Sequence, residues 1–527
     1  MDRFARLWLI LVLLASANFF APSGAWGQSP PQPDGASLFP SVSSDGRYMA
    51  FSSEASTLVA GDRNGTWDVF VRDRLAGVTD RVSVTSLGGQ ANGPSIWPSI
   101  SGDGTRVAFA SYASNLVDGD TNGTWDVFAH DFPTGLTVRA SVDSEGNQAP
   151  GASAFPTLSA DGRHVAFVSE AASGVAGRGE IFVHDLATEA TALVSLPASE
   201  GTRPNGRSEH PSISADGRYV AFASEASNLV KEGNGASDVF VYDRASGATE
   251  LSSVDSSEAQ RPGHSSAPAI SADGRYVAFQ SLASFDRWDR NGGWDIYLRD
   301  RLTGYTGWIS DGHNYPHSHS GGNTSPSITA DGRKIAFSSE APLVSDDTNG
   351  VPDIYEWNDA SDAPSGLGAG FTYRISEAAS HGPTDGASGM PAISADGQVA
   401  AYASLGANLV GGDANGLPDI FVHRWVSLDG GRMGCATDLV SAAIGTFPSP
   451  GTNPDFQDPT QSPGPYWEWR GNGPVGSRQG RWYKPSTGES LHPDLGHGPS
   501  HGPHYDYRAP SGKHYRWYPD GRMVPKR

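Results

Sequence analysis

The sequence has almost no cysteine and few charges. Cys435 is the only cysteine among 527 residues, so no disulfide can form within the chain. Charged residues make up only 18% of the chain, and no apolar stripe with a period of 3.6 residues appears, which argues against long amphipathic helices. Turn-forming residues are abundant instead, with 65 glycines and 37 prolines. The composition therefore predicts short strands joined by many tight turns.

One short pattern occurs seven times along the chain. It is clearest at 211–222, which reads Pro-Ser-Ile-Ser-Ala-Asp-Gly-Arg-Tyr-Val-Ala-Phe, and its Asp-Gly step recurs at intervals of 58, 58, 55, 57, 58 and 65 residues. A fixed period with turn residues at fixed offsets indicates one supersecondary unit that is stacked many times. The seven steps are Asp45-Gly46, Asp103-Gly104, Asp161-Gly162, Asp216-Gly217, Asp273-Gly274, Asp331-Gly332 and Asp396-Gly397.

Each unit has the pattern of four antiparallel strands. Asp-Gly between short β-branched or aromatic runs favours a hairpin, because glycine takes positive φ at no steric cost. In the fourth unit a third run follows at 238–243 and a fourth at 249–254, with a second turn between them. Four antiparallel strands per unit, repeated radially, form a β-propeller blade. We therefore expect an all-β protein with a seven-bladed β-propeller, followed by a linker and a small, mostly β C-terminal domain.

The unit resembles the TolB-like, WD40-like propeller repeat. Its Ser-x-Asp-Gly is followed by Ile/Val-Ala-Phe and then by Asp-Ile/Val-Phe/Tyr-Val. All seven units carry the first part of this pattern, from about residue 38 to about residue 445. The resemblance implies the fold and says little about function, because propellers host binding as well as many chemistries.

The first residues have the pattern of an export signal. Arg3 and Arg6 precede an apolar run at 7–15 that is too short to span a bilayer comfortably, and small residues allow cleavage after Ala17 or Gly27. We expect a signal peptide at 1–27, with an uncleaved anchor as the alternative. No lipoprotein cysteine precedes the mature chain, and nothing later is apolar enough to cross a membrane. The expected location is periplasmic or extracellular.

A second motif, Asp-x-Asn-Gly-x-x-Asp, recurs between the second and third strands of five units. Carboxylate and amide oxygens around a tight turn are the ligands that Ca²⁺ prefers. The alternative is an Asn-Gly turn in which the Asp side chains cap loop N–H groups without an ion. The candidate calcium ligands are Asp62, Asn64, Asp68, Asp120, Asn122, Asp126, Asp289, Asn291, Asp295, Asp347, Asn349, Asp353, Asp413, Asn415 and Asp419, with the variant Glu232, Asn234 and Asp238 in the fourth unit.

No catalytic constellation is visible in the seven units. The loop that carries His313, His317 and His319 could bind a transition metal or simply face solvent. The funnel of the ring, or one of its faces, is the default ligand site of this architecture. The sequence does not identify the protein or glycan that would bind there.

The chain changes character after the last unit. Residues 446–464 are rich in Pro, Ser and Gly and have the composition of a linker. Residues 465–527 contain ten Lys or Arg and five Asp or Glu, a net charge of +5; since 1–27 carry +1 and the whole chain −21, residues 28–464 carry −27. The tail also holds ten aromatic residues. Basic charge interleaved with aromatic rings suits phosphate contact and base stacking, which favours nucleic acid as a partner.

The tail resembles the C-terminal toxin domain of bacterial polymorphic toxins, specifically the type 37 group. The matching features are Trp-Tyr at 482–483, Thr-Gly-Glu-Ser-Leu-His-Pro-Asp-Leu at 487–495, Gly-Pro-His-Tyr-Asp-Tyr at 502–507 and Pro-Asp-Gly at 519–521. The resemblance covers about the last 50 residues. The members of this group are inferred to be toxins, usually with nuclease action. The resemblance therefore implies the same for this tail, together with an immunity protein as its partner.

Two His-x-Asp pairs are the candidate catalytic groups of this tail. In an extended strand, residues i and i+2 lie on the same face, so each pair can converge on one site. Histidine can transfer protons near neutral pH, and a basic side chain can stabilise the extra charge on phosphorus. The catalytic candidates are His492, Asp494, His497, His504 and Asp506, with Lys484, Arg508 or Lys513 for the phosphate.

The same histidines and aspartates could have roles other than catalysis. They could bind Zn²⁺ or another divalent metal, in a catalytic or a purely structural role, or be ordinary surface residues. The sequence thus predicts an exported propeller that carries a small nuclease toxin, with RNA favoured over DNA as substrate. The alternative is a non-enzymatic envelope or extracellular protein whose propeller and basic tail bind proteins, glycans or nucleic acid.

Overall fold

The protein is described here by a computed structural model that covers most of the repeat region and six strands of the tail. The described residues are 33–170, 179–199, 202–230, 235–311, 322–359, 370–380, 382–428 and 432–439, and then 468–471, 480–484, 489–494, 504–508, 514–517 and 523–525. The chain divides into two compact units, Met1–Ala443 and Ile444–Arg527. Strand is the only regular structure longer than a turn in the described residues. No helix capable of crossing a membrane was found among them.

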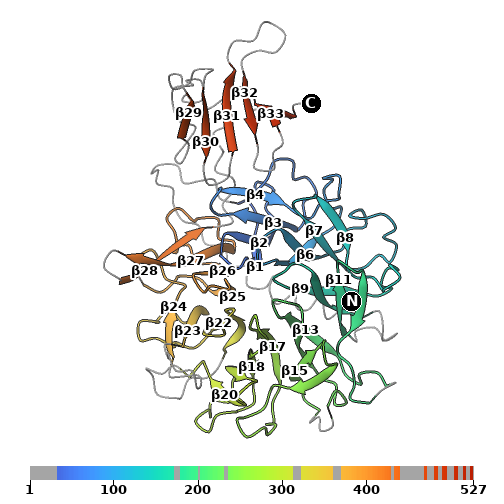
Figure 1. The fold of residues 1–527 in the computed structure, drawn as a ribbon. Helices are drawn as coiled ribbons and strands as arrows, with labels where there is room; N and C mark the ends of the chain where they lie inside the picture. Colours follow the sequence, from blue (N-terminus) through green and yellow to red (C-terminus); the bar gives the residue numbers. More distant parts are fainter. Residues whose placement is uncertain are drawn as a thin grey trace. The chain divides into compact units, whose positions relative to one another are not determined.

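The first unit is a ring of seven four-stranded antiparallel sheets (Figure 1). Each sheet consists of four consecutive strands, and its first strand lies nearest the centre of the ring. The first three blades are β1 (Ser37–Val42), β2 (Tyr48–Ser53), β3 (Asp68–Asp73) and β4 (Val78–Arg81); β5 (Ser95–Ile100), β6 (Arg106–Ser111), β7 (Asp126–Asp131) and β8 (Leu136–Arg139); and β9 (Ser153–Leu158), β10 (His164–Ser169), β11 (Glu180–Asp185) and β12 (Ala190–Leu193).

The remaining four blades follow the same order. They are β13 (Ser208–Ile213), β14 (Tyr219–Ser224), β15 (Asp238–Asp243) and β16 (Ala248–Leu251); β17 (Ser265–Ile270), β18 (Tyr276–Ser281), β19 (Asp295–Asp300) and β20 (Tyr305–Trp308); β21 (Thr324–Ile328), β22 (Lys334–Ser339), β23 (Asp353–Asn358) and β24 (Phe371–Arg374); and β25 (Ser388–Ile393), β26 (Val399–Ser404), β27 (Asp419–Leu428) and β28 (Arg432–Leu439). This architecture confirms the all-β, seven-bladed propeller predicted from the repeat.

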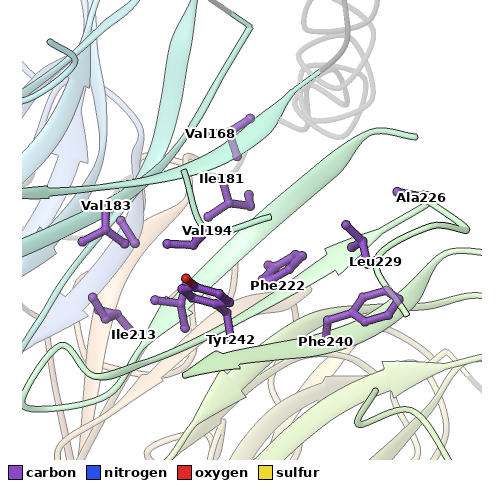
Figure 2. Packing of buried hydrophobic residues seen from close by; sticks show 12 residues of the cluster. Val168, Ile181, Val183, Val194, Ile213, Phe222, Ala226, Leu229, Phe240 and Tyr242 are labelled. Atoms are coloured by element: carbon purple, nitrogen blue, oxygen red, sulfur yellow. The ribbon is translucent and has the colours of Figure 1, made fainter. Parts of the chain in front are cut away.

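The second and third strands of each blade form the hydrophobic layers between blades. They are short apolar runs rather than alternating strands, because both of their faces are covered by neighbouring blades. Figure 2 shows one such layer, where Val168 and Ile181 of the third blade pack with Phe222 of the fourth. The outer strands alternate between more and less exposed residues, as β12 does, because only one of their faces is covered.

The predicted Asp-Gly turns join the first and second strands of every blade. Their seven glycines have φ between 66° and 74°, which confirms the hairpin prediction. In the first blade the Asp45 carboxylate accepts hydrogen bonds from the Ser43 hydroxyl at 2.8 Å and from the Arg47 backbone N–H at 3.0 Å. The repeated aspartate is therefore part of the turn.

The glycine of each turn also lies against the preceding blade. A Cβ atom added to Gly104 would lie 2.1 Å from Cδ2 of Tyr48, and one added to Gly274 would lie 2.2 Å from Cδ2 of Tyr219. In each pair the ring belongs to one blade and the glycine to the next. Glycine is therefore required at these turns both for its φ and for its lack of a side chain.

Backbone hydrogen bonds link these seven turns into a closed circle. The residue before each Asp, which is serine, glycine or alanine in every blade, takes part in it. The bonds run from Ser44 N to Gly102 O, Gly102 N to Ala160 O, Asp161 N to Ala215 O, Ala215 N to Ala272 O, Ala272 N to Ala330 O, Ala330 N to Ala395 O and Asp396 N to Ser44 O. This face of the ring is thereby held together by main chain, independently of the side chains between blades.

The first and last blades meet without exchanging a strand. Met49 and Phe51 of β2 pack in one cluster with Ala401 of β26, and the Ser37 N–H donates to the Pro418 carbonyl at 2.7 Å. Blade seven is made of four consecutive strands of its own. The ring therefore closes by the same kind of contact that joins its other blades.

The second unit contains a six-stranded antiparallel sheet. Its strands pair in chain order. They are β29 (Glu468–Gly471), β30 (Gly480–Lys484), β31 (Glu489–Asp494), β32 (His504–Arg508), β33 (His514–Trp517) and β34 (Met523–Pro525).

Candidate functional site

Each innermost strand has one residue in the left-handed region of backbone conformation. The residue always precedes a proline, and the pairing with the neighbouring strand shifts register there, as between Leu38 and Ser41 in the first blade. For a residue other than glycine this conformation costs about 1 kcal/mol or more, so the surrounding blade must enforce it. The seven residues are Phe39 (φ 58°), Trp97 (55°), Phe155 (52°), His210 (52°), Ala267 (47°), Ser325 (56°) and Met390 (57°).

All seven of these residues line one cavity on the axis of the propeller. Its volume is about 900 Å³, and the proline that follows each of them lines it as well. Other lining residues, such as Ala36 and Glu54, precede β1 or follow β2. The cavity therefore lies toward the face opposite the Asp-Gly turns. The bulge in each strand supplies one side chain per blade to its wall.

The wall of the cavity is asymmetric. Trp97 stacks on Phe155 with ring centroids 4.1 Å apart, and Phe39 meets Trp97 edge to face at 6.1 Å. The equivalent positions in blades five to seven are Ala267, Ser325 and Met390. Aromatic rings thus form one side of the cavity, while small or flexible side chains leave room on the other.

Only two titratable side chains are found among the described residues that line the cavity, Glu54 and His210. Burial raises the pKa of Glu54, against the effect of a hydrogen bond from Trp67. Burial also lowers the pKa of His210, so its imidazole is neutral at pH 7. Gln280 is held in place: it donates to the Ser266 hydroxyl at 3.0 Å, and its Oε1 accepts the Ser325 N–H at 2.9 Å. These groups suit recognition by stacking and hydrogen bonding.

The Asp-x-Asn-Gly-x-x-Asp loops are hydrogen-bonded within the protein. In the first blade, Asn64 donates to Asp68 at 2.9 Å, and Gln90 donates to both Asp62 at 2.7 Å and Asp68 at 3.0 Å. Ser83 donates to the other oxygen of Asp68 at 2.5 Å. These donors come from positions up to 28 residues away, which is why the motif alone did not reveal them.

The other copies of the loop repeat this pattern. Asn122 donates to Asp126, Asn291 to Asp295, Asn349 to Asp353 and Asn415 to Asp419, at 2.7–3.0 Å. Gln148 donates to Asp120, while tyrosine hydroxyls donate to Asp289 and Asp347. Burial raises the pKa values of Asp238, Asp295 and Asp353 to about 6.

Calcium binding at these loops remains a prediction. Within the described part of the chain, no three His, Cys, Asp or Glu side chains are grouped so as to hold a metal ion. In the first blade the turn is capped by the Asn side chain, because the Thr66 N–H donates to Asn64 Oδ1 at 3.2 Å, while the two aspartates accept from side chains. Asp413 also takes part in an interaction within the protein. Glu232 and Asn234 lie outside the described residues.

The strand pairing of the C-terminal sheet brings the two His-x-Asp pairs together. In the register of β31 and β32, His492 lies opposite Asp506 and Asp494 lies opposite His504. Directly paired residues, and residues two apart in a strand, share a face of a sheet. The four residues therefore lie on one face, as a square of alternating His and Asp positions.

The two described basic candidates of the tail differ in their position relative to this square. Lys484 pairs with Glu489 on the opposite face of the sheet, whereas Arg508 pairs with Ser490 on the same face as the square, two residues from Asp506. His497 and Lys513 fall outside the described residues, as do the three histidines of the loop 313–319 and the expected signal and linker segments.

Comparison with known proteins finds similarity only in fold. No family model and no curated protein matches the chain. Among solved structures, a putative TolB from Agrobacterium tumefaciens is 15% identical with a TM-score of 0.33, over 56% of this chain and 84% of that one. A prolyl endopeptidase structure is 12% identical with a TM-score of 0.46, over 91% of this chain and 55% of that one. A puromycin hydrolase is 14% identical with a TM-score of 0.42, over 92% and 61%.

The likeness is one of fold. At these identities the matches carry no activity, substrate or partner over to this chain. The chain also spans only about half the length of the prolyl endopeptidase structure. Function must therefore be argued from the cavity and from the C-terminal sheet.

The residues that line the cavity were not predicted from the sequence. Their only signal was a proline at a fixed place in each innermost strand, preceded by a different residue in nearly every unit. Residues before proline usually adopt extended backbone, so nothing local indicated a left-handed bulge. A variable position next to an invariant proline, at one place in every unit, was the available clue.

Proposed function

We propose that the propeller is a binding module and that its axial cavity holds the ligand. The observation that carries this proposal is the ring of seven left-handed residues whose side chains all line one cavity. Backbone strain of this kind clusters at functional sites, because the surrounding structure must stabilise it. A volume of about 900 Å³ is within the range of small-molecule sites.

The composition of the cavity wall favours a ligand with a flat apolar part. Trp97 and Phe155 offer stacked rings, and the prolines add further apolar surface. Aromatic rings bury large areas and contribute about 0.5–1.5 kcal/mol per ring pair beyond that burial. Gln280 and Glu54 can orient the ligand through hydrogen bonds.

A panel of small aromatic compounds tests this function. The full-length protein is titrated with compounds of both charge signs and with neutral ones, and binding is followed by calorimetry and by melting temperature. We expect Trp97→Ala to weaken every aromatic ligand about tenfold, whereas Trp288→Ala, an exposed tryptophan that does not line the cavity, leaves binding unchanged. If no compound binds, or if Trp288→Ala has the same effect as Trp97→Ala, the cavity is not the binding site.

We also propose that the C-terminal unit is the effector of an exported protein and acts as a nuclease toxin. The observation in its favour is the square of His492, Asp494, His504 and Asp506 across β31 and β32. Alternating His and Asp positions suit a general acid and base whose tautomers are set by carboxylates. The same square would suit a divalent metal. A toxin of this kind requires an immunity protein in the producing cell.

The nuclease proposal is tested on the full-length protein. It is incubated with total RNA and with plasmid DNA, with and without EDTA, beside a variant that carries both His492→Ala and His504→Ala. Cleavage that this variant loses supports the proposal, and loss of cleavage in EDTA assigns a metal. A folded protein that cleaves neither polymer leaves the C-terminal unit as a non-enzymatic binding module.

A further inference from the structure

The face that carries the cavity is acidic at its rim. The residue directly after the second strand is glutamate in four of the seven blades, Glu54, Glu170, Glu225 and Glu340. Three of these, Glu54, Glu225 and Glu340, are exposed. Of the four, Glu54 alone is among the residues that line the cavity. This face of the ring therefore carries a glutamate in four blades of seven, and such negative charge raises the local concentration of cations.

Aromatic rings stand beside Glu54. Trp67, which lies directly before β3 of the same blade, lines the cavity and hydrogen-bonds the Glu54 carboxylate. Phe39 and Trp97 line the same side, and their rings are in contact. The faces of aromatic rings carry partial negative charge, so they attract cations, and Trp does so most strongly.

Among the residues that the structure describes, neither lysine nor arginine lines the cavity. The one histidine among the described lining residues, His210, stays neutral at pH 7 because burial lowers its pKa. Arg207, close in sequence to His210, is paired with Glu209 at 2.7 Å. A cation in the cavity would thus meet a carboxylate and ring faces without repulsion from the wall.

We propose that the cavity binds an organic cation with an apolar or aromatic body. The body stacks on Trp97 and Phe155, and the cationic head lies between Glu54 and the rings of Phe39 and Trp67. The proposal rests on the proposed binding function and adds the charge of the ligand. Desolvated cation–π contacts are strong enough to give a clear preference over a neutral body of the same shape.

Three probes of one shape test the proposal. They are benzyltrimethylammonium, its neutral isostere 2,2-dimethylpropylbenzene and the anion phenylmethanesulfonate. Each is titrated into the full-length protein by calorimetry at low and at moderate salt. We expect the cation to bind about tenfold more tightly than the neutral probe and the anion more weakly than both, with added salt weakening the cation because Glu54 is exposed.

Two matched variants separate the charge of Glu54 from the charge of the rim. Glu54→Gln keeps the shape of the side chain, and we expect it to weaken the cation five- to tenfold and to leave the neutral probe unchanged. Glu225→Gln makes the same change at the equivalent position of the fourth blade, outside the cavity lining, and we expect less than a twofold effect. Trp97→Ala should weaken both the cation and the neutral probe.

The outcomes distinguish this proposal from the function on which it rests. If the neutral probe binds as tightly as the cation, or if Glu54→Gln leaves the cation affinity unchanged, the cation proposal is wrong and the binding function stands. If Glu54→Gln and Glu225→Gln weaken the cation equally, the preference comes from the acidic rim and not from the cavity. If none of the three probes binds, both proposals fail.

Discussion

Trp97 stacks on Phe155 across the boundary between the second and third blades, with ring centroids 4.1 Å apart and planes inclined by 28°. Both residues have left-handed backbone and both precede proline. Two strained residues thus stabilise each other through their side chains. The same bulge in blades five to seven carries no aromatic ring. The conformation is therefore a property of the blade, while the side chain at that place is free to differ and to shape the cavity.

Ala267→Gly is expected to stabilise the protein. Ala267 has φ of 47°, and glycine removes the steric cost of that conformation, about 1–2 kcal/mol, at an entropic cost of about 0.5–1 kcal/mol. The net gain should be up to about 1 kcal/mol in the free energy of unfolding, measured by denaturant titration. The control is Ala269→Gly, two residues along the same strand, which should lose stability. Equal losses in the two variants would contradict the strain assigned to the bulge.

Gly104→Ala is expected to destabilise the ring strongly. The new Cβ would lie 2.1 Å from the ring of Tyr48 in the neighbouring blade, and φ is 74°. Overpacking and backbone strain together should cost about 2–4 kcal/mol. Gly123 has φ of 63° but open space around it, so Gly123→Ala should cost only about 1 kcal/mol. The difference between the two thermal or denaturant midpoints measures the contact between blades, and a difference near zero would show that Tyr48 moves aside freely.

Asp295→Asn should change how stability depends on pH. Burial raises the pKa of Asp295 to about 6, above its unfolded value of about 3.9. Between these values the folded state binds a proton that the unfolded state does not, so the free energy of unfolding falls as pH rises from about 4 to about 6. Asparagine cannot titrate. The difference in free energy of unfolding between the variant and the wild type should therefore shift in favour of the variant by on the order of 2 kcal/mol as pH rises from 4 to 7.

Asp300→Asn provides the control of opposite sign. Burial acts to raise the pKa of Asp300, but the hydrogen bonds from Arg275 and nearby donors outweigh it, and the net pKa is lowered. Its stabilising effect is present above the unfolded pKa and is lost as pH falls below about 4. The free energy of unfolding of this variant should therefore fall relative to that of the wild type as pH rises toward about 4. Identical pH profiles for the two variants would contradict both assignments.

Calcium should leave the melting temperature of the propeller unchanged. In the first blade, Asn64, Gln90 and Ser83 already donate hydrogen bonds to the motif carboxylates. An ion would have to displace these donors before it could bind. The measurement is a thermal melt in EDTA and in millimolar CaCl₂. A higher melting temperature in CaCl₂ that Asp62→Asn abolishes would establish the calcium site instead.

The Asp-Gly turns could be predicted in full from the sequence, whereas the arrangement of the histidines and aspartates in the tail could be predicted only in part. The Asp-Gly hairpins were predictable because glycine with positive φ is a local requirement, and all seven glycines have it. The His-x-Asp pairs were predictable as two separate pairs. The register that sets His492 opposite Asp506 was not, because strand pairing depends on contacts distant in sequence.

By itself the sequence determined the number of blades, the four strands of each and the turns between them, because a repeated local pattern encodes repeated local structure. The cavity was decided only by the tertiary structure. Seven bulges, each unremarkable in its own unit, meet on one axis once the ring has closed. The partners of the Asp68 carboxylate, such as Gln90 and Ser83, likewise come from other loops of the blade. Both depend on contacts between distant residues, which a local pattern does not encode.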